Sequence, residues 1–158
     1  MKWNEELNAQ SERVLVPGII VVLDLDKFEE YVKSRGLDPY KSNIVSGELT
    51  RLIEEFAWRH RGVVVYGLDY GRGTEEAIIE IPYGVDDLNN VVRDLEEIKA
   101  KIESYGVTLS AVVLYDLVTG KPASNRREAY HGTPGRTRAI RALHAIKRRG
   151  GGKVLVLA

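Results

Sequence analysis

The sequence contains no cysteine among its 158 residues. Disulfide bonds, thiolate nucleophiles and cysteine-ligated zinc sites are therefore excluded. Its three histidines, His60, His131 and His144, lack a metal-binding spacing such as HExxH, which argues against any zinc site. No run of about 18 apolar residues occurs, and no basic segment followed by an apolar one opens the chain. We therefore expect a cytoplasmic protein that is neither secreted nor bound to a membrane.

Acidic residues are scarce in the C-terminal part of the chain. The net charge is zero, but between Lys121 and Lys153 ten Lys and Arg residues accompany one acid, Glu128. A solvated helix usually carries both signs, so this imbalance favours an anionic partner. The alternative is a basic surface helix that balances an acidic neighbouring element. Frequent Glu, Arg, Lys, Val and Ile, with a single Met, is also typical of proteins from thermophiles.

The length fits one domain that can bury a core of its own. Residues 1–16 are polar and irregular and are interpreted as an N-terminal leader, which leaves residues 17–158 as a single domain. Hydrophobic periodicity predicts strands at residues 19–25, 63–68, 77–81, 107–115 and 153–157, and helices at residues 27–35, 40–60, 88–102 and 136–149. A long polar loop, residues 116–135, precedes the last helix. The order β-α-α-β-β-α-β-α-β predicts an α+β, ferredoxin-like sheet that contains antiparallel strands, with its helices on one side.

The first strand ends in two acids, in the segment GIIVVLDLD from Gly18 to Asp26. Residues i and i+2 of a strand point to the same face, so Asp24 and Asp26 are released together at the end of an apolar run. Two such carboxylates offer hard oxygen ligands for Mg²⁺ or a similar cation. For Asp26 an alternative is open, because Asp26 and Glu29 have the spacing of a capping box for the next helix.

The element order and three motifs resemble the catalytic palm shared by GGDEF diguanylate cyclases, class III nucleotide cyclases and related polymerase-type domains. The first motif, LDLDKF, is similar to the DIDxFK signature at the end of the first palm strand. The resemblance implies that Asp24 binds a metal ion and that the Leu25 carbonyl assists it. It also implies that the main-chain amides near Lys27 and Phe28 face phosphates.

The other two motifs lie on the central hairpin and at the C-terminus. GTEEAIIEIP, residues 73–82, resembles GGDEFAIILP, and this match places Glu75 on the metal-binding acid of the turn. AIKRRGGGKVLVL, residues 145–157, resembles the AKxxGRNRVVV ending of GGDEF domains and places Lys147 on the phosphate-contacting lysine. The implied metal ligands are thus Asp24, Leu25, Asp26 and Glu75, with Asp24 and Glu75 close together around Mg²⁺ or Mn²⁺.

The chain departs from the GGDEF pattern at several positions. Arg72 and Thr74 replace a glycine and an acid of the turn, and Val32 stands where an asparagine would read guanine. Glu29 replaces the lysine of DIDxFK, and Gly151 replaces the arginine of the ending. The resemblance therefore implies a divergent relative. Archaeal GTP cyclohydrolase III, which belongs to the same superfamily, is a second possible model for it.

Two groups of residues are candidates for binding phosphate. Lys147, with Arg148 or Arg149, is expected to supply the cationic clamp that transferring phosphoryl groups require. The segment HGTPGRTR places Gly135, Arg136 and Arg138 at the start of the last helix, where main-chain amides favour anions. The alternative for this second segment is a Pro-Gly turn that only begins a helix.

The leading hypothesis is a metal-dependent enzyme that cyclises, condenses or hydrolyses a purine nucleoside triphosphate, with Asp24, Glu75 and Lys147 as catalytic residues. The alternative is a degenerate palm that binds a nucleotide or a cyclic dinucleotide as a sensor or partner module, without catalysis. Nucleic-acid binding by the basic C-terminal part is a third hypothesis, although the chain has no RNP or GxxG motif. The choice between ATP and GTP stays open, as does a homodimer.

Overall fold

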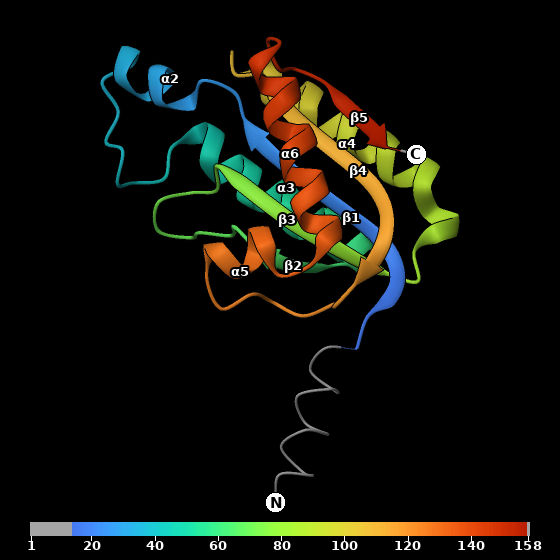
Figure 1. Cartoon of the computed structure of the whole chain (residues 1–158). Helices are drawn as coiled ribbons and strands as arrows, with labels where there is room; N and C mark the ends of the chain where they lie inside the picture. The colour runs from blue at the N-terminus through green and yellow to red at the C-terminus, as the bar shows by residue number, and fades with distance from the viewer. Residues whose placement is uncertain (1–13, 158) are drawn as a thin grey trace, which may run out of the picture.

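The computed structural model describes residues 14–157, so the predicted leader lies almost entirely outside the described residues. A five-stranded sheet with the order β2-β3-β1-β4-β5 forms the centre of the molecule (Figure 1). Its strands are β1 (Val16–Leu25), β2 (Val63–Tyr66), β3 (Glu76–Pro82), β4 (Leu109–Val118) and β5 (Val154–Leu157). The helices are α2 (Phe28–Ser34), α3 (Ile44–Arg59), α4 (Leu88–Glu103), α5 (Arg126–His131) and α6 (Pro134–Arg148), and the short 3-10 turn η1 (Val85–Asp87) precedes α4.

The central strand β1 pairs antiparallel with both β3 and β4. β2 pairs antiparallel with β3, and β5 joins the far edge parallel to β4. The first four strands therefore have the ferredoxin-like arrangement, and β5 extends it. The predicted α+β class and order of elements are confirmed, with α5 and η1 in addition. Within residues 14–157, no helix has the length and apolar character needed to cross a membrane.

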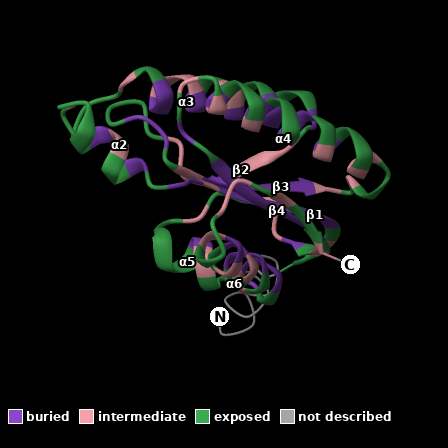
Figure 2. Cartoon of the chain, turned by 90° about the horizontal axis from the view of Figure 1, so that it is seen from above, coloured by how far each residue is buried: buried purple, intermediate pink, exposed green. Residues whose placement is uncertain are grey.

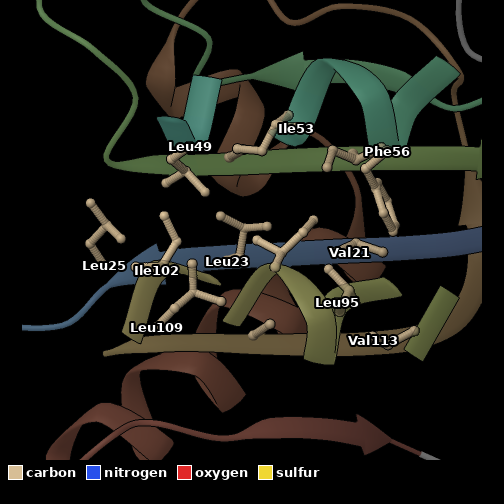
Figure 3. Packing of buried hydrophobic residues seen from close by; sticks show 14 of the residues in the cluster. Val21, Leu23, Leu25, Leu49, Ile53, Phe56, Leu95, Ile102, Leu109 and Val113 are labelled. Atoms are coloured by element: carbon tan, nitrogen blue, oxygen red, sulfur yellow. The ribbon is translucent and has the colours of Figure 1, made fainter. Parts of the chain in front are cut away.

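Helices cover both faces of the sheet, so the expectation of helices on one side was wrong (Figure 2). Alternate residues of β1, Ile19, Val21 and Leu23, pack against α3 and α4 (Figure 3). The residues between them, Ile20 and Val22, pack against α6 on the other face. The physical reason is visible in the sequence, because an unbroken apolar run is typical of a strand buried on both sides.

The predicted loop at residues 116–135 is largely structured. β4 continues to Val118, and the chain beyond it is held where the main-chain N–H of Thr119 and that of Gly120 donate to the buried carboxylate of Glu80, at 3.2 and 3.0 Å. Asn125 then begins α5 by accepting a hydrogen bond from the main-chain N–H of Glu128. Hydrophobic periodicity does not detect these contacts, because polar side chains make them.

The loop between β2 and β3 is docked on the start of α3. Asn43 and Ser46 form a capping box there, so α3 begins at Ile44 rather than at residue 40. Gly73 lies so close to Ser46 that a Cβ would stand 2.0 Å from the Ser46 Oγ, and the hydroxyl of Thr74 lies 2.7 Å from that of Thr50. These contacts fix where β3 begins and hence where its first acids lie.

Candidate functional site

The ammonium group of Lys147 lies among three oxygen atoms at the end of β1. Its Nζ donates to the Leu25 carbonyl oxygen at 2.8 Å and lies 3.2 Å from Asp24 Oδ2 and 3.2 Å from Asp26 Oδ1. We call these four residues, Asp24, Leu25, Asp26 and Lys147, the cation cage. The side chains of Lys147 and Asp24 are 25% and 27% exposed, so the cage is open to solvent. A cation thus already occupies the oxygen set that the sequence predicts for a metal ion.

The packing of α6 explains this arrangement. Asp24 lies on the same face of β1 as Ile20 and Val22, which is the face that α6 covers. Leu143 and Ile146 of α6 are buried against this face, and Lys147 follows directly in the last turn of the helix. The apolar stripe of α6 therefore brings the lysine to the end of β1.

Asp26 is held by hydrogen bonds from β4 and from the segment before β5. It accepts from Thr108 Oγ1 at 2.7 Å, from Ser110 Oγ at 2.9 Å and from the main-chain N–H of Gly152 at 2.9 Å. Burial by itself raises the pKa of Asp26, but these bonds and Lys147 outweigh burial, so the pKa is lowered overall. A Cβ on Gly151 would lie 2.6 Å from the Asp26 carboxylate, which explains a glycine at that position.

The capping-box alternative for Asp26 is not what the structure shows. The N-cap residue, directly before α2, is Lys27, in the left-handed conformation with φ of 52°, and no side chain caps the helix. Phe28 is buried and stacks on Tyr31, with ring centroids 5.8 Å apart. The predicted phosphate contacts of Lys27 and Phe28 could therefore come only from their main-chain amides and the Lys27 ammonium.

Asp24 differs from Asp26 in its acidity. Burial raises the pKa of Asp24 to about 6, against the opposing attraction of Lys147, and the charges of Glu76 and Asp26 add to the rise. Glu76 is the direct partner of Asp24 in the β1–β3 register. Its carboxylate also accepts from the Tyr130 hydroxyl and lies 3.3 Å from Arg126 Nε. Tyr130 has a raised pKa, caused first by burial and then by this hydrogen bond, and so acts as a donor.

Glu75 lies outside this group. Its carbonyl oxygen accepts from the main-chain N–H of Leu25 at 2.9 Å, but its side chain is exposed. Glu75 and Glu76 both line a cavity of about 470 Å³ under the β2–β3 loop, together with Tyr66, Asp69 and Arg72. Across residues 14–157, no group of three or more His, Asp or Glu side chains is placed to hold a metal ion. Of the three predicted carboxylates, the structure thus brings together those of Asp24 and Asp26, with the Leu25 carbonyl oxygen beside them.

The second candidate phosphate site is not free to bind an anion through Arg136. That side chain is 3% exposed and turns inward, where its Nε lies 3.4 Å from Glu80 Oε2 and its Nη1 donates to the Glu128 carbonyl oxygen. Gly135 is buried, and a Cβ on it would clash with Ile20 and Asp116. Arg138 lies 3.2 Å from Asp116 Oδ2. These residues are about 16 Å along α6 from Lys147, at 1.5 Å per residue, whereas Arg148 is exposed beside it.

Several residues of the site were missed from the sequence. Thr108 and Ser110, which fix Asp26, alternate with apolar residues at the start of β4, and this i, i+2 polar pair was a usable signal. Arg126 and Tyr130 carried no signal, because their contacts with Glu76 depend on how the polar segment after β4 folds back over the sheet.

No protein-family model and no curated protein matches this chain. Among solved structures it is similar to the GGDEF domain of DgcB from Caulobacter crescentus in complex with c-di-GMP, with 21% identity and a TM-score of 0.52 over 98% of this chain and 87% of that one. A bacterial light-regulated adenylyl cyclase matches with 12% identity and a TM-score of 0.51 over 66% of this chain. The chain has a GGDEF and class III nucleotide cyclase-like palm fold. It spans 32% of the length of that adenylyl cyclase chain, and identities this low show the fold alone.

Proposed function

We propose that this palm binds a purine nucleoside triphosphate together with Mg²⁺ or Mn²⁺ at the end of β1, and that it cyclises, condenses or hydrolyses the nucleotide. The observation that carries the proposal is the cation cage. Two carboxylates and a carbonyl oxygen converge there on a positive charge. Glu76, the register partner of Asp24, lines a cavity of about 470 Å³. Mg²⁺ in nucleotide sites is usually held by one or two carboxylates, with phosphate oxygens and water completing its shell. The donors that the chain offers therefore fit such an ion.

Each residue then has a defined role. Asp24, the Leu25 carbonyl and Asp26 hold the ion, which when bound neutralises the charge of the phosphates. Lys147 and Arg148 bind phosphate oxygens, and the amides of Lys27 and Phe28 lie at the same strand end. Glu76 is the hairpin acid favoured by its register with Asp24. Glu75 lines the cavity, which is large enough for a nucleoside.

A second candidate function is binding of a nucleotide or a cyclic dinucleotide without turnover. One observation favours it, because the Lys147 ammonium already occupies the oxygen set of the cage, and residues 14–157 hold no group of three acidic or histidine side chains placed for a metal ion. The similar GGDEF domain of DgcB was solved in complex with c-di-GMP, which is compatible with this candidate.

The experiment incubates the protein with each nucleoside triphosphate and Mg²⁺ or Mn²⁺, and separates the products by chromatography, with Asp24→Ala as the matched control. A new product from ATP or GTP that disappears in the variant supports the enzyme. Binding of triphosphate or c-di-GMP without any product supports the second candidate. Absence of both binding and turnover contradicts both.

A further inference from the structure

We propose that Lys147 is an exchangeable counter-ion of the cation cage, which pairs with Asp24 and Asp26 in the free protein and moves to the phosphates when a divalent ion and a triphosphate bind together. This inference rests on the proposed function of the same site. It adds that metal and triphosphate bind as a coupled pair and that Lys147 weakens the binding of metal alone.

The hydrogen-bond capacity of the cage supports the exchange. An ammonium group has three N–H donors, and three oxygen atoms surround that of Lys147 at 2.8, 3.2 and 3.2 Å. The same three oxygens are the donors available to a metal ion. Metal and ammonium therefore compete for one position, and repulsion between two cations forbids both from occupying it.

The surroundings of Lys147 allow it to leave. Its side chain is 25% exposed at the last turn of α6, and it is unbranched. Asp26 keeps its bonds from Thr108, Ser110 and Gly152 when the lysine departs, so the oxygen set stays in place. Asp24 has no other hydrogen-bond donor among the described contacts, so it is the carboxylate that most needs a replacement cation.

The coupling follows from charge balance. A metal ion that enters alone must leave the Lys147 ammonium without its three acceptors, which offsets much of the gain in metal binding. A triphosphate gives the displaced ammonium new anionic partners and supplies further oxygens for the ion. Metal and triphosphate should therefore each strengthen the binding of the other.

The test measures Mn²⁺ binding to the nucleotide-free protein at pH 8, by calorimetry and by electron paramagnetic resonance, for the wild type, Lys147→Met and Arg141→Met. Arg141 is an exposed cation of the same helix, and its replacement controls for the loss of one positive charge. We expect Lys147→Met to bind Mn²⁺ about tenfold more tightly than the wild type, and Arg141→Met to be close to the wild type. In the presence of saturating Mg²⁺, Lys147→Met should bind GTP and ATP about tenfold more weakly than the wild type.

Unchanged Mn²⁺ affinity in Lys147→Met, or an equal gain in Arg141→Met, overturns the proposal. A gain in Mn²⁺ affinity without nucleotide binding in any variant supports the exchange but contradicts the proposed function, so the two failures are distinguishable. If Lys147→Met does not fold, the ¹⁵N-detected ammonium signal of Lys147 in the wild type decides. Its displacement by Mg²⁺ with triphosphate supports the proposal, and an unchanged signal overturns it.

Discussion

Asp24 and Asp26 lie two residues apart on the same face of one chain segment, yet their pKa values are shifted in opposite directions. Asp26 is stabilised in its charged form by Thr108, Ser110 and the Gly152 amide, and its pKa is lowered. Asp24 is partly buried without comparable donors, and burial raises its pKa to about 6. When Asp24 is charged, at neutral pH, it lowers the free energy of unfolding. Such a residue, beside the Lys147 ammonium, is a candidate for function.

The first prediction concerns how Asp24 changes the stability of the fold with pH. The folded-state pKa of Asp24 is about 6 against an ordinary value of 3.8, so the folded state binds a proton more tightly than the unfolded state does. The contribution of Asp24 to stability is thus complete below pH 4 or so and is lost as the pH rises through 6. Asp24→Asn should raise the free energy of unfolding at pH 8 by about 2 kcal/mol and remove the loss of stability between pH 4 and 6.

Asp26→Asn is the matched comparison, and its effect should have the opposite sign. The lowered pKa of Asp26 stabilises the fold above its ordinary value of 3.8, and this stabilisation is lost as the pH falls through the folded-state pKa. The variant should lose about 2 kcal/mol at pH 8, because it weakens three hydrogen bonds to a buried carboxylate. Urea unfolding from pH 4 to 8 measures both variants. Equal destabilisation by both would contradict the assigned acidities.

At the scale of elements, the hairpin register decides which acid can act with Asp24. The second prediction is that Glu76→Gln lowers the affinity for Mg²⁺ with triphosphate about tenfold, whereas Glu75→Gln changes it by less than about threefold. The reason is that Glu76 is paired with Asp24 across β1 and β3, while the Glu75 side chain is exposed outside the cage. Calorimetric titration checks both variants. A larger loss in Glu75→Gln would favour the acid predicted from the sequence.

A third prediction concerns His60, which joins α3 to α4. Its Nδ1 lies 2.5 Å from Asp87 Oδ2 and its Nε2 lies 2.6 Å from Asp94 Oδ2. Both ring nitrogens thus lie within hydrogen-bond distance of a carboxylate that comes from the α4 side. His60→Ala should lower the free energy of unfolding by about 2 to 3 kcal/mol, as expected for buried, charge-assisted bonds. Chemical denaturation measures this, and His144→Ala, an exposed change on α6, should have no effect. A fall of less than 1 kcal/mol, about the net value of a single neutral hydrogen bond, would show that these two contacts do not hold α3 to α4.

Prediction from the sequence succeeded for the helices and strands with a strong hydrophobic periodicity. It failed where contacts between polar side chains determine the position of a residue. The five strands and the long helices followed from their apolar patterns. The DxD segment and the C-terminal lysine pointed to Asp24 and Lys147, which the structure brings within 3.2 Å of each other, while their catalytic role stays a prediction. The sequence could not decide whether Glu75 or Glu76 is the hairpin acid near Asp24, because this depends on where β3 begins. The contacts of Gly73 and Thr74 with α3 fix that point. The inward turn of Arg136 depends on Glu80, a buried acid within an apolar strand.

At the scale of the whole molecule, the basic C-terminal part folds back onto the acidic sheet. Four of its ten basic residues pair with acids from other elements: Arg126 with Glu76, Arg136 with Glu80, Arg138 with Asp116, and Lys147 with Asp24 and Asp26. Part of the charge imbalance along the sequence is therefore offset by ion pairs with other elements of the fold. This favours a compact phosphate site at the end of β1 over an extended nucleic-acid surface, which would need many free cations.

The central claim is that the end of β1 binds a triphosphate together with a divalent ion. Thermal unfolding of the wild type and of Asp24→Ala, with GTP or ATP and with Mg²⁺ or Mn²⁺, tests it most directly. Ligand at a hundredfold excess over its dissociation constant stabilises a protein by about 2.7 kcal/mol, or about 5 to 10 °C for a domain of this size. The account predicts such a rise for the wild type when nucleotide and metal are both present, a much smaller rise with either alone, and no metal-dependent part in Asp24→Ala. An unfolding temperature that no nucleotide changes with either ion, or a rise that Asp24→Ala retains in full, would contradict it.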